Sequence, residues 1–253
     1  MEIPTAYRSY AVRVLVLTGA GVSAESGIPT FRGKDGYWRN LDPAKLATPE
    51  AFARDPKLVW EWYRERRQRI RNAQPNAAHH AIAKLAHHTD QFVLVTQNVD
   101  DLHARAGLPK EKMVQIHGDI FVTRCSRCDF SRRDYDYDQE HEQGKENANL
   151  PRCARCDALM RPGVVWFGER LDADKINSIE RFLARGCCDY VIVVGTTATF
   201  AYVVDWAVRA SAGGGQLIEV NPEETTASEF AAQLIREPAA IALPPFVDQI
   251  IKS

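Results

Sequence analysis

Two Cys-x-x-Cys pairs are the residues whose type and spacing most directly suggest chemistry. They are Cys125 with Cys128 and Cys153 with Cys156, and 24 residues separate the two pairs. Each pair can present two thiolates from a tight turn, and four thiolates form a tetrahedral Zn²⁺ site. One pair alone would equally suggest a redox centre, but two pairs favour zinc. Because sulfur fills all four positions, we expect a structural metal rather than a catalytic one.

Basic residues surround these cysteines and leave a second interpretation open, a ribbon that binds nucleic acid. The arginines are Arg124, Arg127, Arg132, Arg133, Arg152 and Arg155. An acid-rich stretch, 134–149, lies between the two pairs, so a loop explains the long gap. We favour a solvated basic face beside this acidic loop. The remaining Cys187 and Cys188 precede an apolar run, and we interpret both as small core residues.

A second group of candidate residues follows the ends of apolar, β-branched runs. The runs are 12–17, 92–96, 191–194 and 217–220. Such continuous apolar runs predict strands buried on both faces of a parallel sheet. In an open parallel sheet, ligands bind beyond the carboxyl ends of the strands. The residues that follow these runs are therefore candidates for one binding crevice, although buried strands commonly end in polar turns whatever their function.

Side chains suited to ligand binding and proton transfer gather at these expected strand ends. The residues directly at the ends are Thr18, Gly19, Gln97, Asn98, Gly195, Thr196 and Asn221. Asp100 and an isolated His117 follow closely behind the second run. Together with Asn98, they are harder to explain as turn residues alone. We therefore predict a shared cofactor crevice at this edge of the sheet.

The first apolar run leads into a glycine pattern that is typical of dinucleotide sites. Gly19-x-Gly21-x-x-Ala24 matches the fingerprint. The first glycine permits a tight turn, the second lets backbone N–H groups approach a pyrophosphate, and the small third residue lets the next helix pack closely. The acid expected about 20 residues later is absent, because Asp42 precedes a proline and ends no strand. Either the fingerprint is spurious or another residue holds the ribose.

Helix signals fall between the expected strands. A capping residue followed by proline predicts one helix start at Pro49 and a longer helix over 56–71. Within the longer helix Arg66 is anomalous, because it lies on the inner face, where helical spacing calls for an apolar residue. Two more helices are expected, one over 77–86 and one over 198–212. The last of these connects two of the apolar runs as a crossover helix.

Size, charge and hydropathy limit the classes of function. At 253 residues the chain fits one large domain or one domain with an insertion. Its formal net charge of −1 argues against nucleic-acid or membrane partners. The cysteine pattern, the absence of a leader pattern and the short apolar run 190–204 predict a cytoplasmic location. The oligomeric state stays open, and a monomer is the simplest expectation.

Together the motifs resemble those of the sirtuins, the NAD-dependent protein-lysine deacylases. Residues 19–32 match the family's opening motif and residues 96–103 look like its second. His117 with its two neighbours matches the segment that carries the family's catalytic histidine. Residues 164–169 look like the family's substrate-backbone segment, and the four cysteines lie between this segment and His117. The resemblance covers almost the whole chain from about residue 12.

The resemblance implies an α/β fold, in which a small domain is inserted into a Rossmann-like parallel-sheet domain. The small domain would consist of a four-Cys zinc ribbon and a helical module. The expected boundaries are 1–35, 76–120 and 160–253 for the NAD-binding domain, and 36–75 and 121–159 for the small domain. Three positions depart from the family pattern without removing a catalytic group: a threonine for serine within 195–197, the segment 200–202 where proline is frequent, and Gly163.

Within the family the chain is similar to the class III branch, typified by bacterial deacylases and the mitochondrial desuccinylase. The marker is Tyr63-x-x-Arg66, whose side chains leave one face of a helix. A phenol and a guanidinium can hold an acyl carboxylate there, the guanidinium through paired hydrogen bonds. The alternative is that Tyr63 is a core residue and Arg66 a surface one, since Arg64, Arg67 and Arg69 show that arginine is common in this helix.

The resemblance also implies that NAD is consumed rather than used as a hydride carrier. The acyl carbonyl oxygen would attack the ribose C1′ as nicotinamide leaves, and His117 would act as general base on a ribose hydroxyl. The products would be free lysine, nicotinamide and O-acyl-ADP-ribose, and the partners acyl-lysine proteins or peptides. Two other functions stay open: an NAD glycohydrolase or ADP-ribosyltransferase on the same fold, and a non-catalytic NAD-sensing zinc-ribbon module.

The resemblance gives each candidate residue an expected role, with His117 as the catalytic residue. The expected NAD-binding residues are Gly19, Ala20, Gly21, Ser23, Pro29, Phe31, Arg32, Gln97, Asn98, Asp100, Gly195, Thr196, Thr197, Asn221, Glu223 and Ala239. The expected substrate-binding residues are Tyr63, Arg66, Val165 and Phe167, and the expected zinc ligands are Cys125, Cys128, Cys153 and Cys156. Among the other histidines, we expect His103 to be structural and His79, His80, His87, His88 and His141 to be surface or capping residues.

Overall fold

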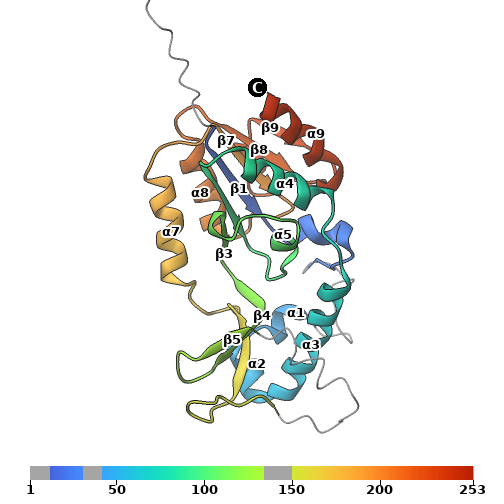
Figure 1. Cartoon of the computed structure of the whole chain (residues 1–253), viewed down its shortest axis with the longest axis vertical. Coiled ribbons are helices and arrows are strands. Elements are labelled where there is room, and N and C mark those ends of the chain that lie inside the picture. The colour runs from blue at the N-terminus through green and yellow to red at the C-terminus, as the bar shows by residue number, and fades with distance from the viewer. Residues whose placement is uncertain (1–11, 31–41, 134–149, 253) are drawn as a thin grey trace, which may run out of the picture.

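The computed structural model describes residues 12–30, 42–133 and 150–252 (Figure 1). The predictions for Phe31, Arg32 and the acid-rich stretch 134–149 lie outside the described residues.

Six parallel strands form the larger sheet, in the order β3-β2-β1-β7-β8-β9. The strands are β1 (Val14–Thr18), β2 (Phe92–Thr96), β3 (Met113–Gln115), β7 (Tyr190–Val194), β8 (Gln216–Val220) and β9 (Gln233–Ile235). The four apolar runs therefore form strands as predicted, and the mostly exposed β9 is an additional one. In this doubly wound order, dinucleotides bind where the strand order reverses, which here lies between β1 and β7.

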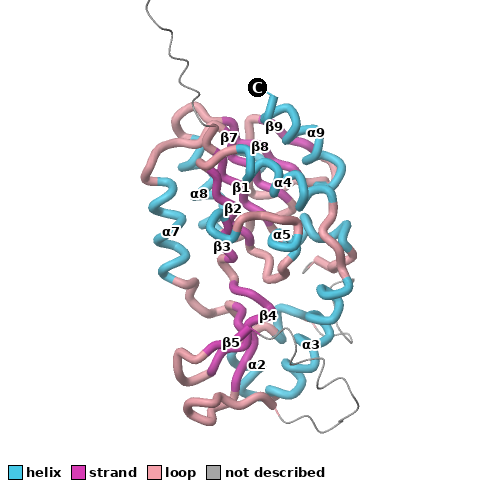
Figure 2. Tube along the Cα trace, in the orientation of Figure 1, coloured by secondary structure: helices cyan, strands magenta, loops and turns pink. Residues whose placement is uncertain are grey.

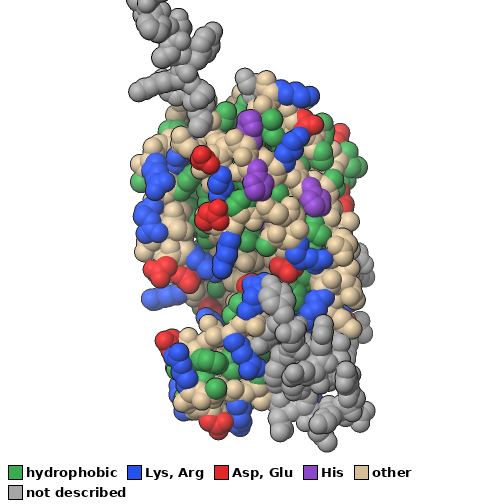
Figure 3. Space-filling view, viewed as in Figure 1, with side chains coloured by type: hydrophobic (Ala, Val, Ile, Leu, Met, Phe, Trp, Pro, Cys, Tyr) green, Lys and Arg blue, Asp and Glu red, His purple; other side chains and the backbone are tan. Residues whose placement is uncertain are grey.

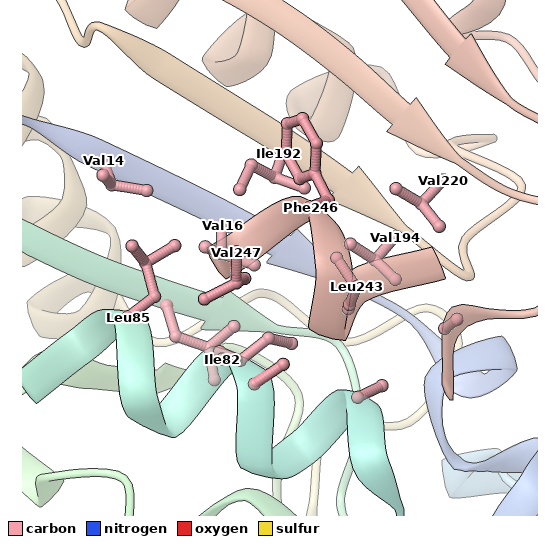
Figure 4. Close-up of a cluster of buried hydrophobic side chains, with 14 of the residues drawn as sticks. Val14, Val16, Ile82, Leu85, Ile192, Val194, Val220, Leu243, Phe246 and Val247 are labelled. Atoms are coloured by element: carbon pink, nitrogen blue, oxygen red, sulfur yellow. The ribbon is translucent and has the colours of Figure 1, made fainter. Parts of the chain in front are cut away.

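Helices cover both faces of this sheet (Figures 1 and 2). On one face lie η1 (Ala20–Ser26), α4 (Ala77–His88) and α9 (Ala239–Lys252), and on the other lie α7 (Ala173–Leu183) and α8 (Ala201–Ser211). Figure 4 shows Ile82 and Leu85 of α4, together with Leu243 of α9, packed against the apolar side chains of the strands. Burying one such side chain contributes about 1.5–3 kcal/mol, so this packing on both faces stabilises the sheet.

A three-stranded antiparallel sheet and a group of helices form the other part of the molecule, drawn below the six-stranded sheet in Figure 1. The elements are β4 (Gly118–Cys125), β5 (Ser131–Arg133), β6 (Met160–Val164), α1 (Pro43–Leu46), α2 (Pro49–Arg54) and α3 (Pro56–Asn72). Three short elements complete the secondary structure of the described residues: α5 (Leu102–Arg105), η3 (Lys110–Lys112) and η4 (Ser228–Phe230). The domain boundaries expected from the sequence stay a prediction.

Capping explains where the helices of this second part begin. Thr48 Oγ1 accepts a hydrogen bond from the amide of Ala51, and Asp55 Oδ1 accepts one from Leu58. Each cap precedes a proline at the first helical position, as the sequence predicted. Asp42 caps α1 in the same way, through the amide of Ala44. This role explains why Asp42 is not the acid at the end of a strand that the dinucleotide fingerprint requires.

The arginine buried in α3 is Arg67, not Arg66. The Arg67 side chain is 0% exposed, whereas Arg66 is half-buried. The Arg67 guanidinium donates hydrogen bonds to the carbonyl of Ile120 at 2.6 Å and to Thr123 Oγ1 at 3.0 Å. Arg67 therefore joins α3 to β4, a role that the sequence pattern did not indicate.

The burial of two further residues can be compared with their predictions. His79 forms a capping box with Asn76, so the capping alternative is confirmed, and its side chain is fully buried. Its ring lies 4.8 Å from the ring of His103, which is buried as expected. Cys188 is buried but Cys187 is exposed, so only one of the two is a core residue.

Charged side chains of both signs are interspersed over the face of the molecule that Figure 3 shows. This mixture agrees with the formal net charge of −1, and it means that a polyanion would meet acidic groups as well as basic ones on this face. Across 12–30, 42–133 and 150–252, none of the helices combines the length and the hydropathy that a membrane span requires.

Candidate functional site

Close backbone packing joins the ends of β1 and β7, where the strand order reverses. The amide of Gly21 donates to the carbonyl of Gly195 at 2.7 Å. A Cβ on Gly21 would lie 2.8 Å from Gly195 Cα, and one on Gly195 would lie 2.4 Å from the nitrogen of Val22. Gly195 also has a φ of +56°, a region that favours glycine. Only glycine fits these two positions, so the fingerprint glycines form one surface with the loop after β7.

Thr196 connects the ends of three strands of the larger sheet. Its Oγ1 accepts a hydrogen bond from Gln97 Nε2 at 2.8 Å, and its carbonyl accepts one from Asn221 Nδ2 at 2.9 Å. Gln97 follows β2, Thr196 follows β7 and Asn221 follows β8. Glu223 is exposed beyond Asn221, whose Oδ1 accepts from its amide. The polar residues predicted to share a crevice are thus brought to one edge of the sheet.

Ser23, Asn98 and Asp100 form a buried hydrogen-bonded group at the same edge. Asn98 Nδ2 donates to Ser23 Oγ at 3.2 Å, and Ser23 Oγ donates to Asp100 Oδ2 at 3.0 Å. Burial raises the pKa of Asp100 to about 6, against the opposing effect of the hydrogen bond from the Leu102 amide. Above that pH the carboxylate supplies a buried negative charge. Such a group suits the binding of hydroxyl groups or of a developing positive charge.

His117 lies between β3 and β4, where the two parts of the molecule meet. Its Nδ1 is 2.9 Å from the carbonyl of Gln97, and its Nε2 is 2.6 Å from Tyr202 Oη. Because a carbonyl can only accept, Nδ1 carries the proton and Nε2 has the lone pair. Burial lowers the pKa of His117, the positive charge of Lys175 lowers it further, and the Gln97 carbonyl opposes this. The ring is therefore neutral at pH 7, as a general base must be.

The segment after β6 lies against both His117 and the small helices. The amide of Val165 donates to the carbonyl of His117 at 2.8 Å, and the amide of Phe167 donates to the carbonyl of Ala47 at 2.9 Å. The Phe167 ring is 45% exposed. Both amides of the predicted substrate-pairing residues thus have acceptors within the chain. The segment is fixed in place beside the catalytic candidate and presents an apolar ring to solvent.

Tyr63 and Arg66 leave one face of α3, near this segment. Tyr63 is buried, and its hydroxyl accepts a hydrogen bond from Trp166 Nε1 at 2.9 Å. The Arg66 guanidinium lies 4.8 Å from the centroid of the Trp62 ring. Burial raises the pKa of Tyr63 and lowers that of Arg66, while the charge of Asp100 favours the protonated Arg66. Arg66 is therefore close enough to the buried Asp100 for electrostatic coupling.

The four cysteines of the two pairs come together at the end of the three-stranded sheet. Cys125 Sγ is 3.5 Å from Cys156 Sγ, and Cys128 Sγ is 3.6 Å from Cys153 Sγ. All four sulfur atoms lie within 4.8 Å of one another. Tetrahedral zinc with bonds of about 2.3 Å separates its sulfur ligands by about 3.8 Å. Amides also donate to the sulfurs, and that of Cys128 lowers the pKa of the Cys125 thiol. The cluster fits one structural zinc ion.

The positions of the remaining predicted residues give less information about a binding role. Ala20 and Pro29 are half-buried near the fingerprint loop, and Thr197 is half-buried after β7. Ala239 is buried at the first residue of α9, where its side chain belongs to the apolar core. For Ala239 a role toward a ligand would have to come from its backbone.

The sequence reasoning missed two residues beside His117, Tyr202 and Lys175. Tyr202 follows His117 by 85 positions, so no local spacing links the two. The unusual segment 200–202 was the available signal, since it departs from the family pattern in which proline is frequent. Lys175 donates from α7 to the carbonyl of Gln115 at 2.7 Å, and nothing in the pattern of α7 indicated that contact.

Comparison with known proteins agrees with this geometry. A family model described as the Sir2 family matches residues 19–201. An NAD-dependent protein deacylase of Aquifex aeolicus is 44% identical, over 94% of this chain and 95% of its own length. NAD-dependent protein deacylase 1 of Archaeoglobus fulgidus is 43% identical, over 95% and 94%. The crystal structure of a Sir2 homolog–NAD complex superposes with a TM-score of 0.85 at 42% identity, over 96% of this chain and 91% of that one. The chain therefore belongs to the Sir2 family and is an NAD-dependent protein deacylase.

Proposed function

We propose that this deacylase removes acidic acyl groups, such as succinyl and malonyl, from protein lysines in addition to acetyl. The observation that carries the proposal is the contact between Trp166 and Tyr63. Because the Tyr63 oxygen accepts the indole N–H, the phenol proton is left to donate to a ligand. Burial raises the pKa of Tyr63, so that proton stays in place at neutral pH.

Arg66 supplies the positive charge that an acyl carboxylate requires. Its side chain projects from the same face of α3, one turn after Tyr63, and stacks on Trp62. A guanidinium can bind a carboxylate through two parallel hydrogen bonds, and partial burial strengthens them. The Tyr63–Arg66 pair would then distinguish an acidic acyl group from acetyl, which has no group to fill the second contact.

In the proposed site, the chain's own residues hold both substrates and move one proton. Gly19, Gly21 and Gly195 would approach the phosphates of NAD, and Asn98 with Asp100 would hold the nicotinamide ribose. NAD supplies an electrophilic ribose carbon with nicotinamide as its leaving group. His117 would accept the proton of a ribose hydroxyl at Nε2. Since the amides of Val165 and Phe167 are occupied, a substrate strand would pair with their carbonyl oxygens.

The remaining NAD contacts are proposed from the same placement. Ala20, Ser23, Gln97, Thr196 and Thr197 would support the phosphates and riboses, and Asn221 with Glu223 would hold the adenosine ribose in place of the missing fingerprint acid. Pro29 and the backbone of Ala239 would border the cofactor. A cytoplasmic location also stays a proposal, and it is supported by a thiol cluster suited to zinc rather than to disulfides.

The test is a panel of lysine peptides that carry acetyl, malonyl or succinyl, each incubated with and without NAD and analysed by mass spectrometry. We expect NAD-dependent loss of all three groups and no activity in His117→Ala. Arg66→Met should reduce kcat/KM for the succinyl peptide tenfold or more, because a charge-assisted contact contributes about 1.5–3 kcal/mol. The acetyl peptide should change by less than about threefold.

A matched control separates this effect from a general loss of positive charge. Arg69→Met removes an exposed arginine of the same helix, whose partner is Glu65 at 3.2 Å. That variant should leave the ratio of desuccinylation to deacetylation unchanged. Equal losses on both substrates in Arg66→Met would refute the carboxylate contact while leaving the deacylase assignment intact. Tyr63→Phe should also lower the ratio of desuccinylation to deacetylation. Because both rates are affected by the lost Trp166 contact, the deacetylation rate serves as the reference for that structural effect.

A further inference from the structure

The nitrogen of His117 that would act as the base already has a partner within the chain. Tyr202 Oη lies 2.6 Å from Nε2. Because Nδ1 donates its proton to the Gln97 carbonyl, Nε2 can only accept, and the Tyr202 hydroxyl must be the donor. The phenol keeps its proton, since burial raises the pKa of Tyr202 well above neutral pH. His117 is thus held through both of its ring nitrogens.

Aromatic packing fixes the Tyr202 ring independently of His117. The Phe200 ring stacks on it with a centroid distance of 5.6 Å and an interplanar angle of 12°. Trp206 packs on it at 4.9 Å. Trp206 is itself held by a hydrogen bond from its Nε1 to Glu180 Oε1 at 3.0 Å. The Phe200 ring also meets the His117 ring edge-on at 5.6 Å. The phenol is therefore aimed at Nε2 by the start of α8.

Nε2 has one lone pair, so it cannot accept from Tyr202 and from a ribose hydroxyl at the same time. We propose that Tyr202 is a positioning residue that holds His117 through Nε2 when acyl-lysine is absent and releases Nε2 before the ring takes up a proton. In that step the phenol O–H···N contact breaks, the ribose hydroxyl donates its proton to Nε2, and Tyr202 keeps its own proton. The inference rests on the proposed role of His117 as the base.

The surroundings of His117 give the contact a measurable consequence. A hydrogen bond donated to the neutral ring disfavours its protonation. Lys175 on α7 acts in the same direction, and the Gln97 carbonyl after β2 acts in the opposite one. Lys175 is in turn under the influence of Asp172 and Asp119. Because removal of the phenol oxygen leaves these groups unchanged, the pKa of His117 should rise when Tyr202 is replaced by phenylalanine.

The test compares wild type with Tyr202→Phe as zinc-loaded, full-length proteins. The pKa of His117 is measured by NMR titration of its imidazole signals, assigned with His117→Ala. We expect the pKa to rise by about one pH unit, which corresponds to one hydrogen bond. The apparent pKa on the acid side of the pH profile of kcat/KM for an acyl peptide should rise by the same amount. On the alkaline plateau kcat should be unchanged or higher, because no phenol competes for Nε2.

An unchanged His117 pKa would overturn the proposal, and so would a lower plateau kcat, which would mean that Tyr202 assists the step. Phe200→Leu is the matched control, because it removes a ring contact with His117 while Trp206 still packs on the Tyr202 ring and keeps the hydrogen bond in place. It should leave the pKa of His117 within about 0.3 pH units of wild type. Activity that persists in His117→Ala would instead refute the role of the base, while the NMR titration would still decide whether the Tyr202 contact exists.

Discussion

All five residues of β1 and of β2 are buried, whereas all three residues of β5 are exposed. The six-stranded sheet has apolar side chains on both faces and two layers of helices over them. Around the cysteines, the buried cluster among the described residues consists of Cys125, Cys153, Ala158 and Met160, with three partly buried residues packed against it. Apolar burial can therefore stabilise the first region without help, while the second has too little of it and requires metal ligation.

The largest expected effect is the loss of a zinc ligand. Cys125→Ser should release the metal, because three thiolates and a hydroxyl bind zinc far more weakly, and structural zinc contributes on the order of 10 kcal/mol in small modules. Atomic absorption should show no zinc, and limited proteolysis should cleave between residues 125 and 160. The six-stranded sheet should stay folded. Cys187→Ser, at an exposed free thiol, should keep the zinc and the protease resistance of wild type.

A cavity in the larger core should have the next largest effect. Ile82→Ala removes a side chain that is 1% exposed between α4 and the sheet, which should cost about 2–5 kcal/mol of unfolding free energy in urea titrations. Lys84→Ala, on the exposed side of the same helix, removes an ion pair with Asp248 and should cost less than about 1 kcal/mol. Similar losses in both variants would contradict the view that apolar burial stabilises this region.

The smallest effect, when it is compared per pH unit, concerns the buried His79. Burial lowers the pKa of His79 from 6.5 to about 4, so the unfolded chain binds a proton that the folded one excludes. Unfolding free energy should therefore fall as the pH drops from 6.5 toward 4, by about 1.4 kcal/mol per pH unit from this group. His79→Gln should flatten that slope in urea titrations, and the exposed His88→Gln should not. Parallel slopes for both variants would argue that His79 is protonated in the folded protein.

Much of the larger sheet was predictable, because strands buried on both faces leave an unbroken apolar signal in the sequence. The strand ends were predictable for the same reason, and with them the edge where Gln97, Thr196 and Asn221 meet. β9 left no such signal, since Gln233 and Leu234 are exposed and only its pairing with β8 makes it a strand.

Side-chain positions that depend on phase or on distant contacts were less predictable. Arg66 and Arg67 are adjacent, and a rotation of about 100° per residue decides which one faces β4. Helical spacing placed Arg66 on the inner face, and it did not indicate that Arg67 is the fully buried arginine. The contact between Tyr202 and His117 depends on how α8 lies against the connection from β3 to β4, which is a property of the packed fold.

The burial of Arg67 also bears on the order in which the molecule folds. A guanidinium loses its hydration when α3 packs, and its replacement partners are the carbonyl of Ile120 and the hydroxyl of Thr123, more than 50 positions later in the chain. Packing α3 before β4 is in place would leave a charge without water and without acceptors, which is strongly unfavourable. We therefore expect the helix and the strand to dock together rather than one after the other.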